Sequence, residues 1–131
     1  ENYRIWKERG FESALVIENA PKHNPEHNLH GHSYLIRLHL SAPLDEVLGW
    51  TVDYGDVKEK FSPIYKQLDH NQLNFIDGLT SPDIRTFVHW IKAQASQKIP
   101  ELDRIDLYET PGCGGILSWG SEPPILPIKA L

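Results

Sequence analysis

The stretch HSYLIRLHL, residues 32–40, alternates between two kinds of side chain and decides the fold class. In an extended chain successive side chains point to opposite faces, so one face carries Tyr34, Ile36, Leu38 and Leu40 and the other carries Ser33, Leu35, Arg37 and His39. This period of two predicts a β-strand with one face against a core. A second strand is expected over Tyr3–Ile17, with a bulge or bend at Gly10.

Two helices are expected after a loop over Asn19–Leu29 and a connection over Ser41–Gly49. Asp53 can cap the first helix, which Pro63 is expected to bend; its apolar stripe is Val57, Phe61, Ile64 and Leu68. Ser81 as N-cap and Pro82 at the first helical position predict the start of the second helix, and Pro100 stops it. Its apolar stripe is Ile84, Phe87, Val88, Ile91 and Ala95.

Two more strands complete the expected order. They are Ile105–Tyr108 and Ile116–Trp119, joined by a turn over Pro111–Gly115, and Trp50–Val52 is a candidate short extension of the sheet. Two strands, two helices and two strands predict an α+β fold, with a four-stranded antiparallel sheet and both helices on one face. We expect one domain over residues 1–120 and an extended, proline-rich tail over 121–131. The two sheet edges favour self-association.

Composition excludes several classes of protein. The 131 residues carry 13 basic and 18 acidic side chains, a net charge of -5, which argues against a nucleic-acid partner. No apolar run approaches the roughly 20 residues that cross a bilayer, so no membrane partner is expected. The N-terminus shows no signal-peptide pattern, and a lone cysteine suits a cytoplasmic location. Cys113 is interpreted as a buried, inert residue of a turn, with a relocated reactive thiol as the alternative.

Histidines are concentrated before the clearest strand. The chain has seven, and four of them, His23, His27, His30 and His32, fall within ten residues. His30 and His32 are two positions apart at the start of a strand, which puts both imidazoles on the same face, where they could bind one metal ion. A catalytic zinc normally has three protein ligands, so a third donor must come from elsewhere. An ordinary strand start is the alternative interpretation.

Several separated motifs, in this order along the chain, resemble the 6-pyruvoyl- and 6-carboxy-tetrahydropterin synthase family. They are FESA (11–14), EHNLHGHSY (26–34), GWTVDY (49–54), LDHNQLN (68–74) and ET (109–110). The resemblance implies the tunnelling fold, in which ββααββ subunits pair into a trimeric barrel and two barrels stack into a homohexamer with active sites between subunits. It also implies a glutamate that anchors a pterin, a three-histidine zinc, and proton transfer by a cysteine and an Asp-His pair.

Two of these roles have matching residues here. Glu109 matches the pterin anchor, and a carboxylate can accept two hydrogen bonds from the pterin ring N–H and the exocyclic amine. Asp69 and His70 match the Asp-His pair, in which the acid orients a base that titrates near neutral pH. Outside the family context, Glu109 would be interpreted as a solvated carboxylate at a strand end.

Three positions depart from the family pattern. Leu15 stands where the first zinc histidine is expected, so His30 and His32 would hold zinc weakly unless His27, His23 or Glu26 supplies the third donor. Glu26 stands in place of the catalytic cysteine and can still act as a base. Arg85 occupies the position of a glutamate near the pterin pocket, where it would favour an anionic or differently oriented substrate; the alternative is a solvated helix residue.

These observations lead to one functional hypothesis and two alternatives. The hypothesis is a divergent pterin-converting lyase that acts on a dihydroneopterin-type substrate with a weakened zinc site. Its predicted catalytic residues are Glu26, Asp69 and His70, its substrate-binding residues Glu109 and Arg85, and its metal ligands His30 and His32. The alternatives are a metal-free pterin- or purine-binding homologue without synthase activity, and a structural or regulatory barrel subunit, because a shared fold does not establish a shared activity.

Overall fold

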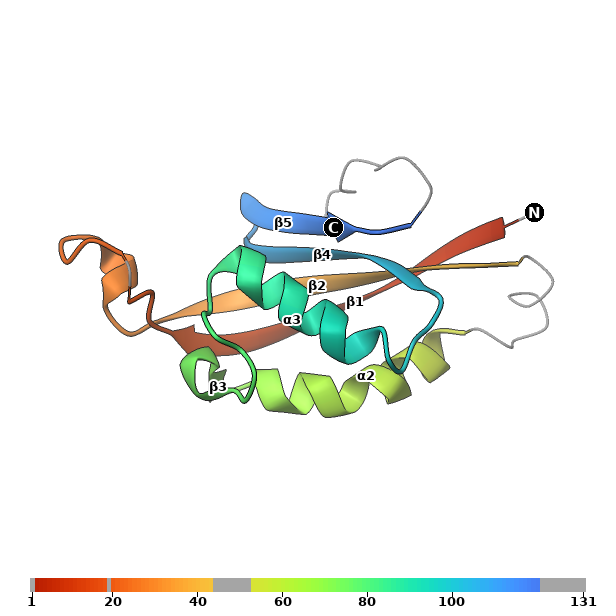
Figure 1. Ribbon diagram of the computed structural model, residues 1–131, viewed down its shortest axis with the longest axis horizontal. Coiled ribbons are helices and arrows are strands. Elements are labelled where there is room, and N and C mark those ends of the chain that lie inside the picture. Colours follow the sequence, from red (N-terminus) through yellow and green to blue (C-terminus); the bar gives the residue numbers. More distant parts are fainter. Residues whose placement is uncertain (1, 19, 44–52, 121–131) are drawn as a thin grey trace.

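The computed structural model describes residues 2–18, 20–43 and 53–120 of the chain. Within them, five strands form one sheet in the order β3-β1-β2-β4-β5, and two α-helices lie on the same side of it (Figure 1). The strands are β1 (Asn2–Leu15), β2 (His30–Pro43), β3 (Asn71–Gln72), β4 (Leu102–Thr110) and β5 (Cys113–Ser118). The helices are α2 (Tyr54–Leu68) and α3 (Ile84–Ala95), with 3-10 turns η1 (Pro25–His27) and η2 (Leu73–Phe75).

The predicted α+β class is confirmed, with one strand more than expected. β3 is only two residues long and pairs parallel with β1, so the sheet is antiparallel except at this edge. The predicted extension at Trp50–Val52 and the tail over 121–131 lie outside the described residues. No helix of the described ranges is long and apolar enough to cross a membrane.

β1 and β2 pair in one continuous antiparallel register, from Asn2 opposite Pro43 to Leu15 opposite His30. The predicted bulge at Gly10 is therefore wrong, because Gly10 pairs regularly with Leu35. The irregularity lies instead between β2 and β4, at His39 and Leu40.

Each helix begins at an acidic cap. The Asp53 carboxylate accepts a hydrogen bond from the Asp56 backbone N–H at 2.8 Å, as predicted, and α2 then runs through Pro63 as one helix. α3 begins two residues later than predicted. Its cap is Asp83 rather than Ser81, because the Asp83 carboxylate accepts from both the backbone N–H and the hydroxyl of Thr86, each at 2.9 Å.

The hydrophobic core lies between the helices and one face of the sheet. α2 packs on β1, and α3 packs on β4 and β5 (Figure 1). Every apolar side chain of the predicted strand stripe is buried, and both helices bury theirs apart from Ile84, which is half-buried. Burial of each large apolar side chain contributes about 1.5–3 kcal/mol, so this face supplies most of the stabilisation.

The opposite face of the sheet carries a buried polar cluster. Asp106 is fully buried and accepts hydrogen bonds from His39 Nε2 at 3.0 Å and from Arg104 Nε at 2.7 Å. Arg37, 1% exposed, lies 3.6 Å from the same carboxylate and also pairs with Glu8. Burial alone would raise the pKa of Asp106, but the hydrogen bonds and charges of His39 and Arg104 outweigh it and hold that pKa below its ordinary value.

The hairpin between β4 and β5 is tighter than predicted. β5 begins at Cys113, inside the expected turn, and both strands are longer than their predicted ranges. Cys113 is exposed, so its interpretation as a buried residue of a turn is wrong. Its partner in the ladder is Thr110.

Candidate active site

His30 and His32 begin β2 on the face that the helices cover. Their rings lie edge to face with centroids 5.0 Å apart, which confirms that both point to the same side. His30 Nδ1 donates to the backbone carbonyl of Asn28 at 2.8 Å, which leaves the lone pair on Nε2. In the described part of the chain this buried Nε2 has no hydrogen-bond partner. His30 is therefore a suitable first ligand for a metal ion.

Leu15 occupies the place beside these two histidines. It pairs directly with His30 across the β1–β2 ladder and is 3% exposed. An aliphatic side chain supplies no lone pair, so β1 offers no third ligand here. Among the side chains that the structure describes, no group of three His, Cys, Asp or Glu residues is placed to hold one ion. The described residues thus do not fit the three-ligand site of a catalytic zinc.

The loop before β2 contains the other predicted donors. His27 ends η1, and its Nδ1 lies 3.1 Å from the carbonyl oxygen of Ala20, so this nitrogen is already hydrogen-bonded within the loop. Glu26 lies in the same 3-10 turn, and its side chain is outside the part of the chain that the structure describes. His23 is exposed.

Asp69 and His70 form the predicted pair at the end of α2. Asp69 Oδ2 lies 2.9 Å from His70 Nδ1, so the proton on Nδ1 is shared with the carboxylate and Nε2 is the nitrogen left to act as a base. The other oxygen of Asp69 accepts from the backbone N–H of Glu12 at 2.9 Å. The hydrogen bond from the Glu12 N–H has the larger effect and the contact with His70 the smaller one, and both hold the pKa of Asp69 below its ordinary value. The carboxylate therefore stays charged and orients the imidazole.

The backbone of His70 is in the left-handed region, with φ of 60°. This conformation follows the C-cap of α2 and is common for glycine at that place, whereas it is costly for other residues. A hydrogen bond from the His70 N–H to the carbonyl of Glu12, at 2.6 Å, stabilises it. Asn74 fixes the same end of β1 by accepting from and donating to the backbone of Val16. The pair is thus attached to β1 at backbone level.

Glu109 lies at a bulge near the end of β4. The ladder with β5 shifts register between Tyr108 and Thr110, which leaves Glu109 as the extra residue. Gly114 makes this close pairing possible: a Cβ there would lie 2.3 Å from the carbonyl oxygen of Leu107. Bulges turn a side chain away from the regular alternation and are frequent beside active sites. Glu109 is half-buried.

Tyr34 lies next to His32 on β2, the strand that pairs with the β4 strand of Glu109. Its ring meets His32 edge-on with centroids 5.6 Å apart, and the charge of Glu109 acts on its hydroxyl. Sequence reasoning placed Tyr34 only in the core. A hydroxyl within an otherwise apolar stripe was the signal that could have marked it.

Arg85 lies in the first turn of α3 and is exposed. Its backbone carbonyl accepts a hydrogen bond from His89 Nδ1 at 2.7 Å, so His89 stands beside it on the outer surface of the helix. This position is compatible with the solvated interpretation and with contact to an anionic group on a ligand.

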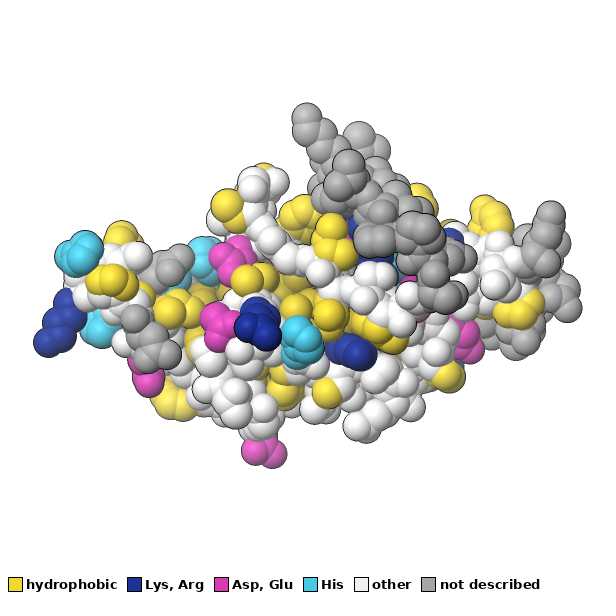
Figure 2. Space-filling view, turned by 45° about the horizontal axis from the view of Figure 1, so that its top comes forward, with side chains coloured by type: hydrophobic (Ala, Val, Ile, Leu, Met, Phe, Trp, Pro, Cys, Tyr) yellow, Lys and Arg dark blue, Asp and Glu magenta, His cyan; other side chains and the backbone are white. Residues whose placement is uncertain are grey.

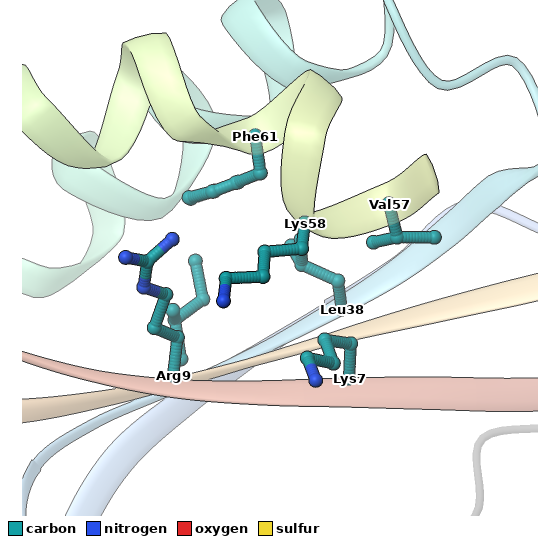
Figure 3. Close-up of a pocket in the computed structure, with 7 residues that line it drawn as sticks. Lys7, Arg9, Leu38, Val57, Lys58 and Phe61 are labelled. Atoms are coloured by element: carbon teal, nitrogen blue, oxygen red, sulfur yellow. The ribbon is translucent and has the colours of Figure 1, made fainter. Parts of the chain in front are cut away.

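A crevice between β1 and α2 carries three basic side chains, Lys7, Arg9 and Lys58, above apolar walls (Figure 3). The Arg9 guanidinium lies 3.5 Å above the ring centre of Tyr65. The enclosed space is about 10 Å³, which is room for a single water molecule. The crevice is therefore too small for a bicyclic heterocycle.

The predicted residues lie towards the end of the sheet where β1 and β4 end and β2 begins, with the Asp-His pair beside β1 and Glu109 on β4, so that β1 and β2 lie between them. Leu15 and Ser13 pair with His30 and His32, and the Asp-His pair is hydrogen-bonded to Glu12 on the same strand. Histidine side chains are visible at this end of the molecule (Figure 2). The fold and these residues define a class of protein. It is a small α+β domain in which one carboxylate, Asp69, orients a histidine and a second carboxylate, Glu109, lies at a strand bulge.

Comparison with known proteins identifies the family. The model of the 6-pyruvoyl tetrahydropterin synthase family matches residues 4–118, and the chain belongs to this family. A curated relative from Pyrococcus furiosus, dihydroneopterin monophosphate aldolase, is 26% identical over 112 residues, which cover 83% of this chain and 95% of the relative.

Solved structures confirm the fold. The 6-pyruvoyl tetrahydropterin synthase of Caenorhabditis elegans superposes with a TM-score of 0.81 at 16% identity, covering 92% of this chain and 97% of that one. A variant of the Plasmodium vivax 6-pyruvoyltetrahydropterin synthase, in which a catalytic glutamate is replaced by alanine, superposes with a TM-score of 0.69 at 18% identity, covering 89% and 97%. The predicted tunnelling fold of the subunit is thereby confirmed.

Proposed function

We propose that this chain is a lyase that cleaves the side chain of a dihydroneopterin-type pterin by acid–base chemistry, with a weakened metal site. The observations that support the proposal are the Asp69–His70 pair beside β1 and the carboxylate of Glu109 at the bulge of β4, in a chain of this family. The named relative from Pyrococcus furiosus acts on a substrate of this chemical type, which supports the choice of an aldol cleavage.

In this proposal Glu109 binds the heterocycle. Its carboxylate accepts two parallel hydrogen bonds, one from the ring N–H and one from the exocyclic amine of the pterin. The bulge in β4 presents the carboxylate away from the regular alternation of the strand. Two hydrogen bonds to one charged group fix the orientation of the ring and of its side chain.

His70 acts as the base. Its Nε2 takes the proton from the side-chain hydroxyl next to the bond that breaks, and Asp69 stabilises the imidazolium that forms. The O–H electrons form the carbonyl of the leaving aldehyde, and the electrons of the broken C–C bond pass into the ring imine. A proton returned to the ring-side carbon completes the 6-hydroxymethyl-dihydropterin.

Glu26 is the second proposed proton carrier. It stands four residues before His30, and a carboxylate is a base at neutral pH. The Plasmodium vivax enzyme uses a catalytic glutamate, which supports this role. Arg85 is proposed to bind an anionic group on the pterin side chain, such as a phosphate ester.

No step is assigned to a metal ion. His30 and His32 would hold it if present, with His27 as the candidate third ligand, and Leu15 makes such a site weak. The same observation favours a second candidate function, a metal-free protein that binds a pterin without converting it. A structural or regulatory subunit of a homo-oligomer would do neither.

The test is incubation with 7,8-dihydroneopterin and its monophosphate, with products separated by chromatography, beside a fluorescence titration with each pterin. We expect turnover that His70→Gln reduces at least about 100-fold, the low end for loss of a proton-transfer group. Glu109→Gln should reduce it at least about tenfold, because hydrogen bonds to a charged group are lost. Glu59→Gln, on the exposed side of α2, is the matched control. Arg85→Gln should raise KM for the monophosphate only. Saturable binding without turnover would favour the second candidate, and no binding would refute both.

A further inference from the structure

Tyr34 is held rigidly in the core beside the candidate site. It is 2% exposed, and its ring stacks on Phe11 with centroids 5.0 Å apart. Phe87 of α3 meets the same ring edge-on at 5.4 Å, and His32 meets it at 5.6 Å. Contacts from β1, β2 and α3 therefore fix the position of the phenol before any ligand arrives.

The hydroxyl of this ring is left without a hydrogen bond. It is buried, and it has no partner among the residues that the structure describes. Buried polar groups without partners are rare in folded proteins because they lose their hydrogen bonds to water. A tyrosine phenol has an ordinary pKa of about 10, so it is protonated near neutral pH and can act as a donor.

Glu109 lies on the strand next to that of Tyr34. Leu35 of β2 pairs with Tyr108 of the antiparallel strand β4. Tyr34 precedes Leu35 and Glu109 follows Tyr108, so both residues lie one position from this pair, on the same side of it. Glu109 is half-buried at a bulge, so its side chain can turn, whereas the ring of Tyr34 cannot. A carboxylate has about four lone-pair positions, so two ligand N–H groups leave room for a further donor.

We propose that Tyr34 is a positioning residue for Glu109, whose carboxylate accepts the phenol O–H when it binds the pterin. The inference rests on the proposed function of Glu109 as the anchor. The ligand draws Glu109 inwards, and the carboxylate then supplies the missing partner of the hydroxyl. A hydroxyl that merely remains in the core would not respond to the ligand.

Tyr34→Phe removes the oxygen alone and retains the aromatic contacts. We expect the midpoint of urea unfolding to stay the same or rise, because an unpartnered buried hydroxyl is lost. The Kd for dihydroneopterin should rise roughly 10- to 100-fold, the effect of one hydrogen bond to a charged group. Tyr108→Phe is the matched control, since the Tyr108 hydroxyl is also buried without a partner in the described chain but belongs to the opposite face of the sheet. This control should leave Kd unchanged.

Two further measurements separate positioning from a structural role. In a double-mutant cycle, Tyr34→Phe should cause little further loss once Glu109→Ala is present. In protein labelled with 13C at the tyrosine Cζ, the resonance assigned by its loss in Tyr34→Phe should shift when the pterin saturates the unmodified protein.

The outcomes are distinguishable. If the unmodified protein does not bind dihydroneopterin, or if Glu109→Ala binds it equally well, the proposed anchor is wrong and this inference fails with it. If binding needs Glu109 but Tyr34→Phe changes Kd less than about twofold, or if the Tyr34 resonance does not shift, only the positioning role is overturned.

Discussion

Replacement of Gly114 by alanine tests whether the bulge at Glu109 depends on close approach of β5 to β4. A Cβ at residue 114 would lie 2.3 Å from the carbonyl oxygen of Leu107 and 2.9 Å from Cα of Tyr108. Both contacts are below the 3.0 Å that real Cβ atoms respect, and both involve backbone atoms that cannot rotate away. The two strands must therefore move apart by about 0.7 Å at this pair, the difference between 3.0 Å and 2.3 Å.

The expected cost follows from this displacement. Overpacking of a well-packed site costs about 1–3 kcal/mol, and one weakened ladder hydrogen bond adds about 1 kcal/mol. A loss of about 2–4 kcal/mol is less than the stability of a typical domain, about 5–15 kcal/mol, so the variant should still fold. Glu109 lies next to Tyr108 and should be displaced with it. Because small displacements in a site reduce activity strongly, pterin affinity should fall at least about tenfold.

The assay combines urea unfolding with fluorescence titration of dihydroneopterin. Gly112→Ala is the matched control, because a Cβ there meets no atom within 4 Å and should cost less than about 0.5 kcal/mol. The reasoning is refuted if Gly114→Ala unfolds at the same urea concentration as the unmodified protein and binds the pterin equally well.

Two other substitutions test the remaining parts of the structure. Leu15→His should lower the free energy of unfolding of the metal-free protein by about 2–4 kcal/mol, and zinc at 100 times its Kd should restore about 2.7 kcal/mol. Urea unfolding measures both effects, with Leu15→Gln as the control. If the variant retains no more zinc than the unmodified chain, the expected position of the missing ligand is wrong. Asp106→Asn should lower the free energy of unfolding at pH 7 by about 3 kcal/mol. The folded-state pKa of Asp106 is depressed, so its contribution to the free energy of unfolding is present above the unfolded pKa of about 3.9 and is lost as the pH falls through the folded pKa. The difference in the free energy of unfolding between the two proteins should therefore narrow below about pH 4. A difference that stays constant down to about pH 3 would refute this linkage.

Most of the fold could be predicted because its elements are amphipathic. The alternation in β2 and the apolar stripes of α2 and α3 are local patterns that report which face is buried. β3 could not be predicted, because its two residues are too few to show a period and their pairing with Ser13 and Ala14 of β1 depends on a contact far along the chain. The start of β5 was missed because glycine-rich residues predict a turn, whereas Gly114 permits close strand pairing.

The candidate site was predicted in part. The Asp-His pair and the shared face of His30 and His32 follow from short-range spacing, and the structure brings each together. The bulge at Glu109 and the unpartnered hydroxyl of Tyr34 depend on contacts between elements far apart in the sequence. Such features are set by register and packing, so no local pattern reveals them.

The backbone of His70 has a consequence for how this domain can change over time. A glycine at this C-terminal turn would relieve torsional strain and make the domain more resistant to heat, at the expense of the imidazole. Stability therefore favours glycine at position 70, whereas the proposed chemistry requires histidine. Lineages under pressure only to stay folded would drift towards glycine or asparagine here, so retention of histidine in a descendant would mark continued use of the side chain.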